Sequence, residues 1–421
     1  MTRKNDILLI LGSFFAIRFY SNSPLNDIYY PLEAIFLVGC FLFLIKYFLF
    51  SNMNFSRSTL FEKYILFLII FIPVYNIFVS SLSFKQPLIY SVLSVREWFV
   101  VGFFIWLYES LKSKNLHLET LTKVFTYLAF FSVGNSFYYN FIFDINSLPE
   151  DTLLTPYLPT NQTYLFTEYR FKTNDFFTVF GLIFFFLKYI IHRKILDLIF
   201  LIIFCGNILF VVQSRVTLLS LFLTYIFFIF YRNFDIINIT KYIFRTVIFI
   251  ILFNILFFTY NSDLLTNFYY LFGEAFVVLS GEFSSDNSAN SRIFQAFIML
   301  NYVLDNFYTL LFGVGELSNQ FSDGYRTYFG YFFPEDLGVF GSIFVFGVIG
   351  FLVIHLLPFL YSYKLIKEVR SDNVFITSMV YLLVFEIIRA IPYGSFHFQF
   401  QYLLFPISIL TYWHTNQKRI L

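Results

Sequence analysis

The sequence predicts an all-α polytopic membrane protein. Hydrophobic residues make up 58% of the 421 positions and charged residues only 13%, a composition too apolar for a soluble domain of this length. The apolar segments are continuous runs without strand-like alternation, and a helix needs about 20 such residues to cross the hydrocarbon core of a bilayer. We therefore expect about 12 transmembrane helices with a large extracytoplasmic loop that holds an amphipathic helix.

The expected helices fall into two groups separated by one long polar segment. Residues 1–260 hold helices one to nine, residues 261–337 form the large loop, and residues 338–421 hold helices ten to twelve. The twelve spans are predicted at 6–22, 31–50, 64–82, 92–110, 121–143, 175–191, 195–213, 215–231, 242–260, 338–361, 373–391 and 396–414.

The positions of lysine and arginine set the orientation, because cytoplasmic loops carry an excess of both. Most of the 28 lysines and arginines fall on one side if the N-terminus is inside. This arrangement places both termini in the cytoplasm and the large loop outside. Arg18 interrupts the first span and is expected to reach the headgroups. Glu386 and Arg389 are three residues apart and should pair across one helix turn.

Two outward segments carry most of the polar residues. The first covers about residues 144–175 and is an irregular loop because it contains three prolines. In the large loop, Ser291 is expected to cap a helix that starts at Arg292. Its predicted apolar stripe comprises Ile293, Ala296, Phe297, Leu300, Val303, Leu304, Phe307, Leu310 and Leu311, with Gln295, Tyr302, Asp305, Asn306 and Thr309 opposite.

That amphipathic helix is expected to lie on the outer membrane surface or over the helix bundle. The Gly313-Val314-Gly315 segment should end it. Although two glycines can suggest a nucleotide-binding loop, this pair follows a helix and not a strand, so we interpret it as a turn.

Bulk features exclude several classes of function. The net charge of +2 gives no reason to expect nucleic acid as a partner. Cys40 and Cys205 both lie in apolar spans, where a thiol behaves as a small hydrophobe. The sequence shows no Asp-x-Asp motif and no grouping of His, Asp and Glu with the spacing of metal ligands.

Five short motifs in a fixed order resemble a bacterial family, the O-antigen polymerase and O-antigen ligase superfamily. They are the Ser-Arg pair that opens Ser214–Leu219, the arginine-headed helix at Asn290–Phe294, the turn at Phe312–Gly315, the acidic segment Glu335–Gly338 and the glycine-flanked segment Gly347–Gly350. Each motif is short, so the specificity lies in their order and spacing.

The resemblance covers about residues 195–361 by motif. It implies a membrane glycosyltransferase that transfers a glycan from undecaprenyl diphosphate to a sugar hydroxyl, on the outer face of a bacterial cytoplasmic membrane. The product would be O-antigen of lipopolysaccharide, capsule or exopolysaccharide. The implied partners are the undecaprenyl-diphosphate-linked oligosaccharide, membrane lipid, a chain-length regulator and a flippase. Because the donor is no nucleotide sugar, we expect neither a metal nor another cofactor.

The resemblance also implies roles for named residues. A departing diphosphate needs positive charge, and a guanidinium group binds phosphate oxygens with two parallel hydrogen bonds. Arg215 and Arg292 each open a helix on the outer side and are the first two candidates, and Arg170 or Arg326 would complete the site.

Glu335 and Asp336, at the start of the tenth span, are the candidates for the general base that the acceptor hydroxyl needs. Partial burial there would raise a carboxyl pKa towards neutrality. Asp336 is the preferred of the two.

Three other functions remain open from the sequence. A ligase would deliver finished glycan to lipid A core or to protein, but ligases of this superfamily carry a histidine near the end of the large loop, and none lies between Asn261 and Asp336. A flippase or other transporter should show repeated halves and polar residues at mid-membrane. A structural scaffold would tolerate neutral replacement of Arg215 and Arg292.

Overall fold

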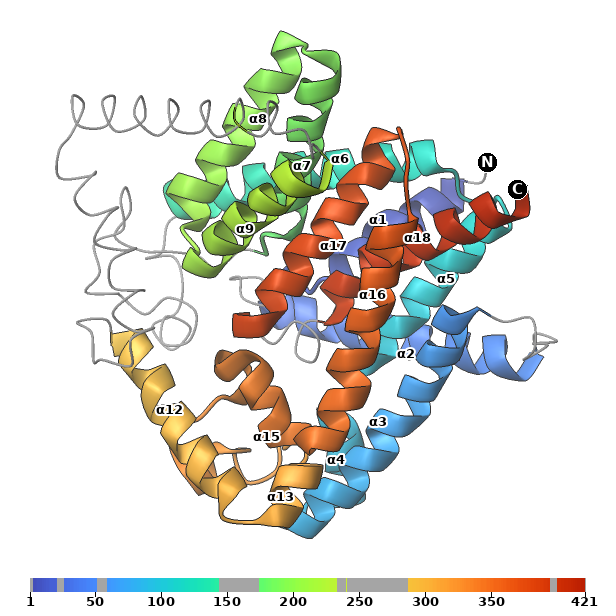
Figure 1. The fold of residues 1–421 in the computed structure, drawn as a ribbon. Helices are drawn as coiled ribbons and strands as arrows, with labels where there is room; N and C mark the ends of the chain where they lie inside the picture. The colour runs from blue at the N-terminus through green and yellow to red at the C-terminus, as the bar shows by residue number, and fades with distance from the viewer. Residues whose placement is uncertain are drawn as a thin grey trace.

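A computed structural model describes residues 3–20, 26–50, 59–143, 174–232, 240, 287–393 and 400–420. Within these ranges the chain forms helices and contains no strand (Figure 1). The helices are α1 (Arg3–Ala16), α2 (Asn26–Phe50), α3 (Leu60–Phe84), α4 (Leu88–Ser94), η1 (Arg96–Val100), α5 (Val101–Lys112), α6 (Leu118–Phe137), η2 (Tyr138–Ile142), α7 (Phe176–His192), α8 (Ile195–Asn207), η4 (Ile208–Val212), α9 (Arg215–Arg232), α12 (Asn287–Leu304), α13 (Phe307–Phe312), α14 (Arg326–Phe329), η5 (Pro334–Leu337), α15 (Gly338–Phe351), η6 (Leu352–Leu356), α16 (Leu357–Glu368), α17 (Val374–Tyr393) and α18 (Phe400–Ile420).

Five helical stretches in the described part of the chain are long and apolar enough to cross a membrane. They are Ile28–Leu49, Leu60–Phe84, Ile195–Val212, Pro334–Glu368 and Val374–Pro392. A sixth span is obtained if two neighbouring helical segments count as one. These are Leu88–Ser94 and Arg96–Lys112, which meet at a bend of 52°. The all-helical class is therefore confirmed for the described residues, and these apolar helices support a membrane-embedded protein. The count of twelve stays a prediction, and the span expected at 242–260 lies outside the described residues.

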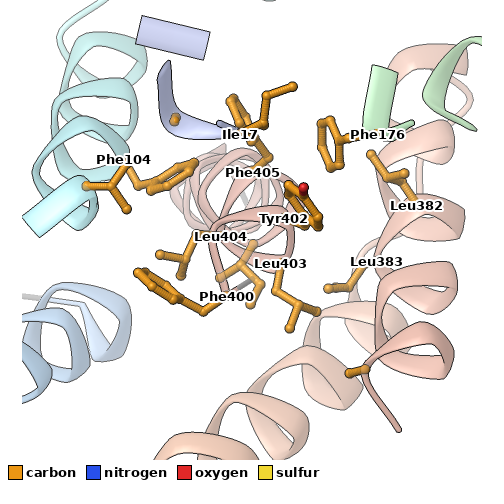
Figure 2. Packing of buried hydrophobic residues seen from close by; sticks show 14 of the residues in the cluster. Ile17, Phe104, Phe176, Leu382, Leu383, Phe400, Tyr402, Leu403, Leu404 and Phe405 are labelled. Atoms are coloured by element: carbon orange, nitrogen blue, oxygen red, sulfur yellow. The ribbon is translucent and has the colours of Figure 1, made fainter. Parts of the chain in front are cut away.

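Helix α18 lies at the centre of the apolar core (Figure 2). The ring of Phe405 meets Phe104 of α5 at 4.9 Å, Phe125 of α6 at 5.5 Å and Phe176 of α7 at 5.3 Å between ring centres. Edge-to-face and tilted contacts of this kind are the favourable geometry for aromatic pairs. The phenylalanine-rich composition thus supplies part of the core.

Polar side chains gather in two layers at the two ends of the helices. We define the first polar layer by Arg18, Glu33, Glu97, Asp175 and Arg389, which stand at the end of α1, the start of α2, η1, the start of α7 and the end of α17. Its contacts are described with the candidate site below.

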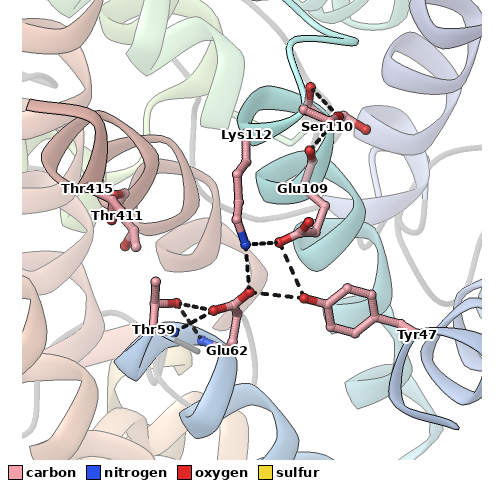
Figure 3. Close-up of polar contacts among 9 residues, drawn as sticks. Tyr47, Thr59, Glu62, Glu109, Ser110, Lys112, Thr411 and Thr415 are labelled. Carbon is pink, nitrogen blue, oxygen red and sulfur yellow. Dashed lines mark hydrogen bonds and ion pairs between the residues drawn. The ribbon is translucent and has the colours of Figure 1, made fainter. Parts of the chain in front are cut away.

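The second polar layer lies at the opposite ends of these helices. Lys112, the last residue of α5, contacts Glu62 at the start of α3 at 3.4 Å, and Tyr47 near the end of α2 donates to Glu62 at 3.0 Å (Figure 3). His414 of α18 and Glu368 of α16 are 3.0 Å apart. The helices therefore run between the two layers in alternating directions, as expected of a polytopic bundle.

Helix α15 is broken at Gly347, which has φ 63° and ψ −172°, a backbone conformation that is essentially restricted to glycine. The loop after α13 crosses the break, and Gly315 donates its N–H to the carbonyl of Val345 at 2.8 Å. Gly313 and Gly347 approach so closely that a Cβ on either would overlap the backbone of the other segment. The span predicted at 338–361 falls within the apolar stretch Pro334–Glu368, and the structure adds a break at Gly347 that the sequence prediction did not include.

Candidate functional site

Arg18 joins three elements in the first polar layer. It follows α1 with a left-handed φ of 52°, and its guanidinium contacts Glu33 of α2 at 2.9 Å and Glu97 of η1 at 2.8 Å. The expectation that Arg18 extends to the headgroups is thus replaced by a paired arginine inside the protein. Two carboxylates around one guanidinium leave this group with a net negative charge.

A second ion-pair group in this layer is centred on Arg389. Its guanidinium donates to Asp175 at 2.8 Å and contacts Glu386, one helix turn earlier, at 2.9 Å. The hydroxyl of Thr217 donates to the other oxygen of Asp175 at 2.6 Å. Arg215 stands two residues before Thr217 at the start of α9 and is half-buried. The predicted pairing of Glu386 with Arg389 is confirmed, and Asp175 extends it to α7 and α9.

Three further contacts connect these groups into one layer. The side-chain amide of Asn174 donates to the carbonyl of Ile17, next to Arg18, and to the hydroxyl of Tyr402. The ring of Tyr402 lies 4.8 Å from the guanidinium carbon of Arg389. Arg18 and Arg389 therefore belong to one connected network of polar contacts within the bundle.

Side-chain amides fix the loop after α13 to the corner between α3 and α4. Asn76 accepts the N–H of Glu316 and donates to its carbonyl, while Gln86 donates to the same carbonyl at 3.1 Å and accepts the N–H of Ser318 at 2.9 Å. The Glu316 carboxyl is half-buried, and this burial together with the negative charge of Glu97 raises its pKa to about 8. The loop thus brings a carboxyl group that titrates near neutral pH to the first polar layer.

Helix α12 differs from the predicted amphipathic helix in its start, its end and its packing. It ends at Leu304, and the last part of the predicted stripe lies on the separate helix α13, whose C-cap is Gly313. Helix α12 begins at Asn287, so Ser291 lies within the helix instead of capping it. It packs against α13, α15 and η5 through a face with Gln295, Met299 and Val303 buried, whereas Phe297 of the predicted stripe is 59% exposed. Apolar side chains facing a membrane and apolar side chains facing protein look alike in sequence, so the stripe alone does not identify the packed face.

Phe333, the residue before η5, brings several predicted site residues to one turn. Its N–H donates to Oε1 of Gln295 at 2.8 Å, and the guanidinium carbon of Arg326 lies 5.0 Å from the centre of its ring. Arg292 precedes Gln295 by three residues on α12, so the two share one side of that helix. Glu335 follows Phe333 by two residues and is exposed. We call this arrangement the Phe333 turn.

The electrostatics of the Phe333 turn distinguish it from the two ion-pair groups. Arg292 and Arg326 are exposed, and neither forms a salt bridge with another residue in the described ranges. Glu335 interacts with the charges of Glu97, Glu316 and Arg18. The turn therefore offers two guanidinium groups with available N–H donors, and its Glu335 interacts with charges of the first polar layer.

The other predicted residues have different outcomes. Arg215 is half-buried at the start of α9, two residues before Thr217. Asp336 is half-buried, and its N–H donates to the carbonyl of Phe333 at 3.0 Å. Arg170 lies outside the described residues.

Sequence reasoning missed Gln295, because it was placed on the outward polar face of the helix. A signal was present, since Gln295, Met299 and Val303 recur every four residues along one side of α12.

Within the described ranges, no group of three or more His, Cys, Asp or Glu side chains has the geometry to hold a metal ion. No family model matches the chain, and a search of curated proteins finds no relative.

Proposed function

We propose that the chain is a polymerase of lipid-linked oligosaccharide repeat units of O-antigen, capsule or exopolysaccharide. In this proposal twelve helices cross a bacterial cytoplasmic membrane, both termini are cytoplasmic, and the Phe333 turn faces outward. The observation that carries the proposal is the Phe333 turn itself, where the Arg326 guanidinium lies against the Phe333 ring, Gln295 of α12 accepts the N–H of Phe333, and Glu335 follows two residues later.

The proposed reaction uses these groups in a single displacement. The acceptor hydroxyl transfers its proton to a carboxylate while its oxygen forms a bond to the anomeric carbon of the donor. The bond between that carbon and the diphosphate oxygen breaks, and undecaprenyl diphosphate departs with both electrons. Arg292 and Arg326 stabilise the negative charge that develops on the diphosphate. Arg215 is retained as a further diphosphate ligand.

Glu335 is the better supported of the two candidate bases. Its side chain is exposed and within electrostatic reach of Glu97 and Glu316, so an acceptor hydroxyl can approach it. Asp336 is half-buried within the short helix η5. We therefore assign proton transfer to Glu335 and place Asp336 beside it in support.

The proposal is tested by the length of the glycan made in a deletion strain of the native host. The strain is complemented with wild-type protein, Arg215→Ala, Arg292→Ala or, as a control, Arg370→Ala at equal expression. Arg370 is exposed beside the second polar layer and has no proposed role. We expect long chains with the control and short chains with the other two variants. Long chains with both Arg215→Ala and Arg292→Ala would show that the diphosphate assignment is wrong.

A further inference from the structure

Gln295 carries a buried amide with an unused donor. Its side chain is only 1% exposed. Oε1 accepts the N–H of Phe333, which fixes the orientation of the amide because a backbone N–H pairs only with the oxygen. Nε2 has no hydrogen-bond partner in the structure. Since an unsatisfied buried donor costs about 1–3 kcal/mol, this nitrogen is suited to bind an acceptor that the described part of the chain does not supply.

The surroundings of Nε2 indicate the chemistry of that acceptor. Arg292 lies three residues before Gln295 on α12 and is exposed, and the guanidinium carbon of Arg326 lies 5.0 Å from the centre of the ring of Phe333, whose N–H Gln295 accepts. Guanidinium groups and the free side of this amide offer N–H donors and no acceptor. A ligand that satisfies all three carries several acceptor oxygens and negative charge, as a phosphoryl group does.

We propose that Gln295 is a further binding residue for the phosphoryl oxygens of the lipid-linked substrate, acting between Arg292 and Arg326. This inference rests on the proposed function and deepens it. The amide adds a directed hydrogen bond without adding charge. Because the same amide holds the N–H of Phe333, it fixes the bound phosphoryl group relative to Glu335, two residues further on. A neutral residue would thus align the leaving group with the base.

The test measures the affinity of the purified full-length protein for undecaprenyl diphosphate by isothermal titration calorimetry in detergent. Gln295→Met removes both hydrogen-bonding functions, whereas Gln295→Glu keeps an acceptor for Phe333 and puts an oxygen where Nε2 stood. Met299→Leu is the matched control, because Met299 is buried on the same side of α12 one turn later. Phosphatidylglycerol is titrated in parallel to represent a lipid head group.

We expect Gln295→Met to weaken binding of undecaprenyl diphosphate about ten-fold or more, as for a hydrogen bond to a charged group. Gln295→Glu should weaken it at least as much, and Met299→Leu should leave it unchanged. If Gln295→Met does not fold, Gln295→Glu decides the result, because it retains the contact with Phe333.

Three results would overturn the inference. If the wild type and both Gln295 variants bind undecaprenyl diphosphate with equal affinity, the inference about Gln295 is wrong and the proposed function is unaffected. A loss confined to phosphatidylglycerol would assign the site to a lipid head group. If the wild-type protein does not bind undecaprenyl diphosphate at all, both the inference and the proposed donor substrate are wrong.

Discussion

Arg389 and Asp175 are 214 positions apart in the sequence, and their side chains are 2.8 Å apart in the structure. The Arg389 side chain is 3% exposed and that of Asp175 14%, so the pair lies largely outside water. It connects the end of α17 to the start of α7, and Thr217 connects the same carboxylate to α9. The first polar layer therefore stabilises the relative positions of three helices that the sequence separates widely.

Replacing Asp175 should destabilise the protein strongly. Asp175→Ala removes a carboxylate that contacts the buried Arg389, and removing one partner of a buried ion pair typically costs about 3–5 kcal/mol. Thermal unfolding of the purified protein in detergent measures the effect. The control is Asp305→Ala, since Asp305 is exposed and forms no salt bridge within the described residues. Identical unfolding temperatures for the two variants would contradict a stabilising role for Asp175.

Gly347 should not tolerate a side chain. Gly347→Ala introduces a Cβ that overlaps the backbone around Gly313 and imposes a φ of 63° on a residue other than glycine, a strain of about 1–3 kcal/mol before the overlap is counted. Gly39→Ala in α2 is the matched control, because a Cβ there meets nothing within 4 Å. We expect the first variant to lose folded protein in size-exclusion chromatography and the second to behave as the wild type. Normal yield of Gly347→Ala would mean that the crossing of the two segments is misplaced.

The local parts of the fold could be predicted from the sequence, and the long-range parts could not. Pairing of Glu386 with Arg389 and the turn at Gly313 follow from spacing and from glycine, and the structure confirms both. The partner Asp175 lies on a distant helix, so no local pattern indicates it. The break at Gly347 arises because another loop takes a carbonyl of α15, which hydropathy does not report.

The candidate site shows the same division. Arg292, Arg326 and Glu335 were selected from the sequence, but the contacts that Phe333 makes with Arg326 and with Gln295 of α12 depend on tertiary packing. Gln295 was assigned to the outward face because it is polar, although its four-residue spacing from Met299 and Val303 indicates the buried side of α12.

Glu316 should make stability depend on pH. Its folded pKa of about 8 lies above the usual glutamate value of 4.5, so the folded state binds more protons than the unfolded state between these two values. Stability contributed by this group therefore falls as pH rises from about 4.5 to about 8. Glu316→Gln removes the titration. Unfolding temperatures are measured for both proteins from pH 5 to pH 9. The unfolding temperature of Glu316→Gln should rise relative to that of the wild type as pH rises. A difference between the two proteins that does not change with pH would refute this account of the Glu316 carboxyl.

Neutralising Glu335 should abolish activity without unfolding the protein. General base catalysis contributes about 10²–10⁴-fold to a rate, so Glu335→Gln is expected to reduce chain elongation by at least about 100-fold. Asp336→Asn should have a smaller effect, because Asp336 supports the turn and does not take the proton. Initial rates of glycan elongation in isolated membranes give the comparison. A larger loss with Asp336→Asn than with Glu335→Gln would reverse the assignment of the base.

The most direct test of the central claim is reconstitution of the purified protein with undecaprenyl-diphosphate-linked repeat units from the native host. The products are separated by size, and released undecaprenyl diphosphate is quantified. The proposed function predicts that the wild-type protein forms glycans of several repeat units and releases one undecaprenyl diphosphate per bond formed, whereas Arg292→Ala forms few. If repeat units stay single and no undecaprenyl diphosphate is released by the folded wild-type protein, the chain is not a polymerase of these substrates.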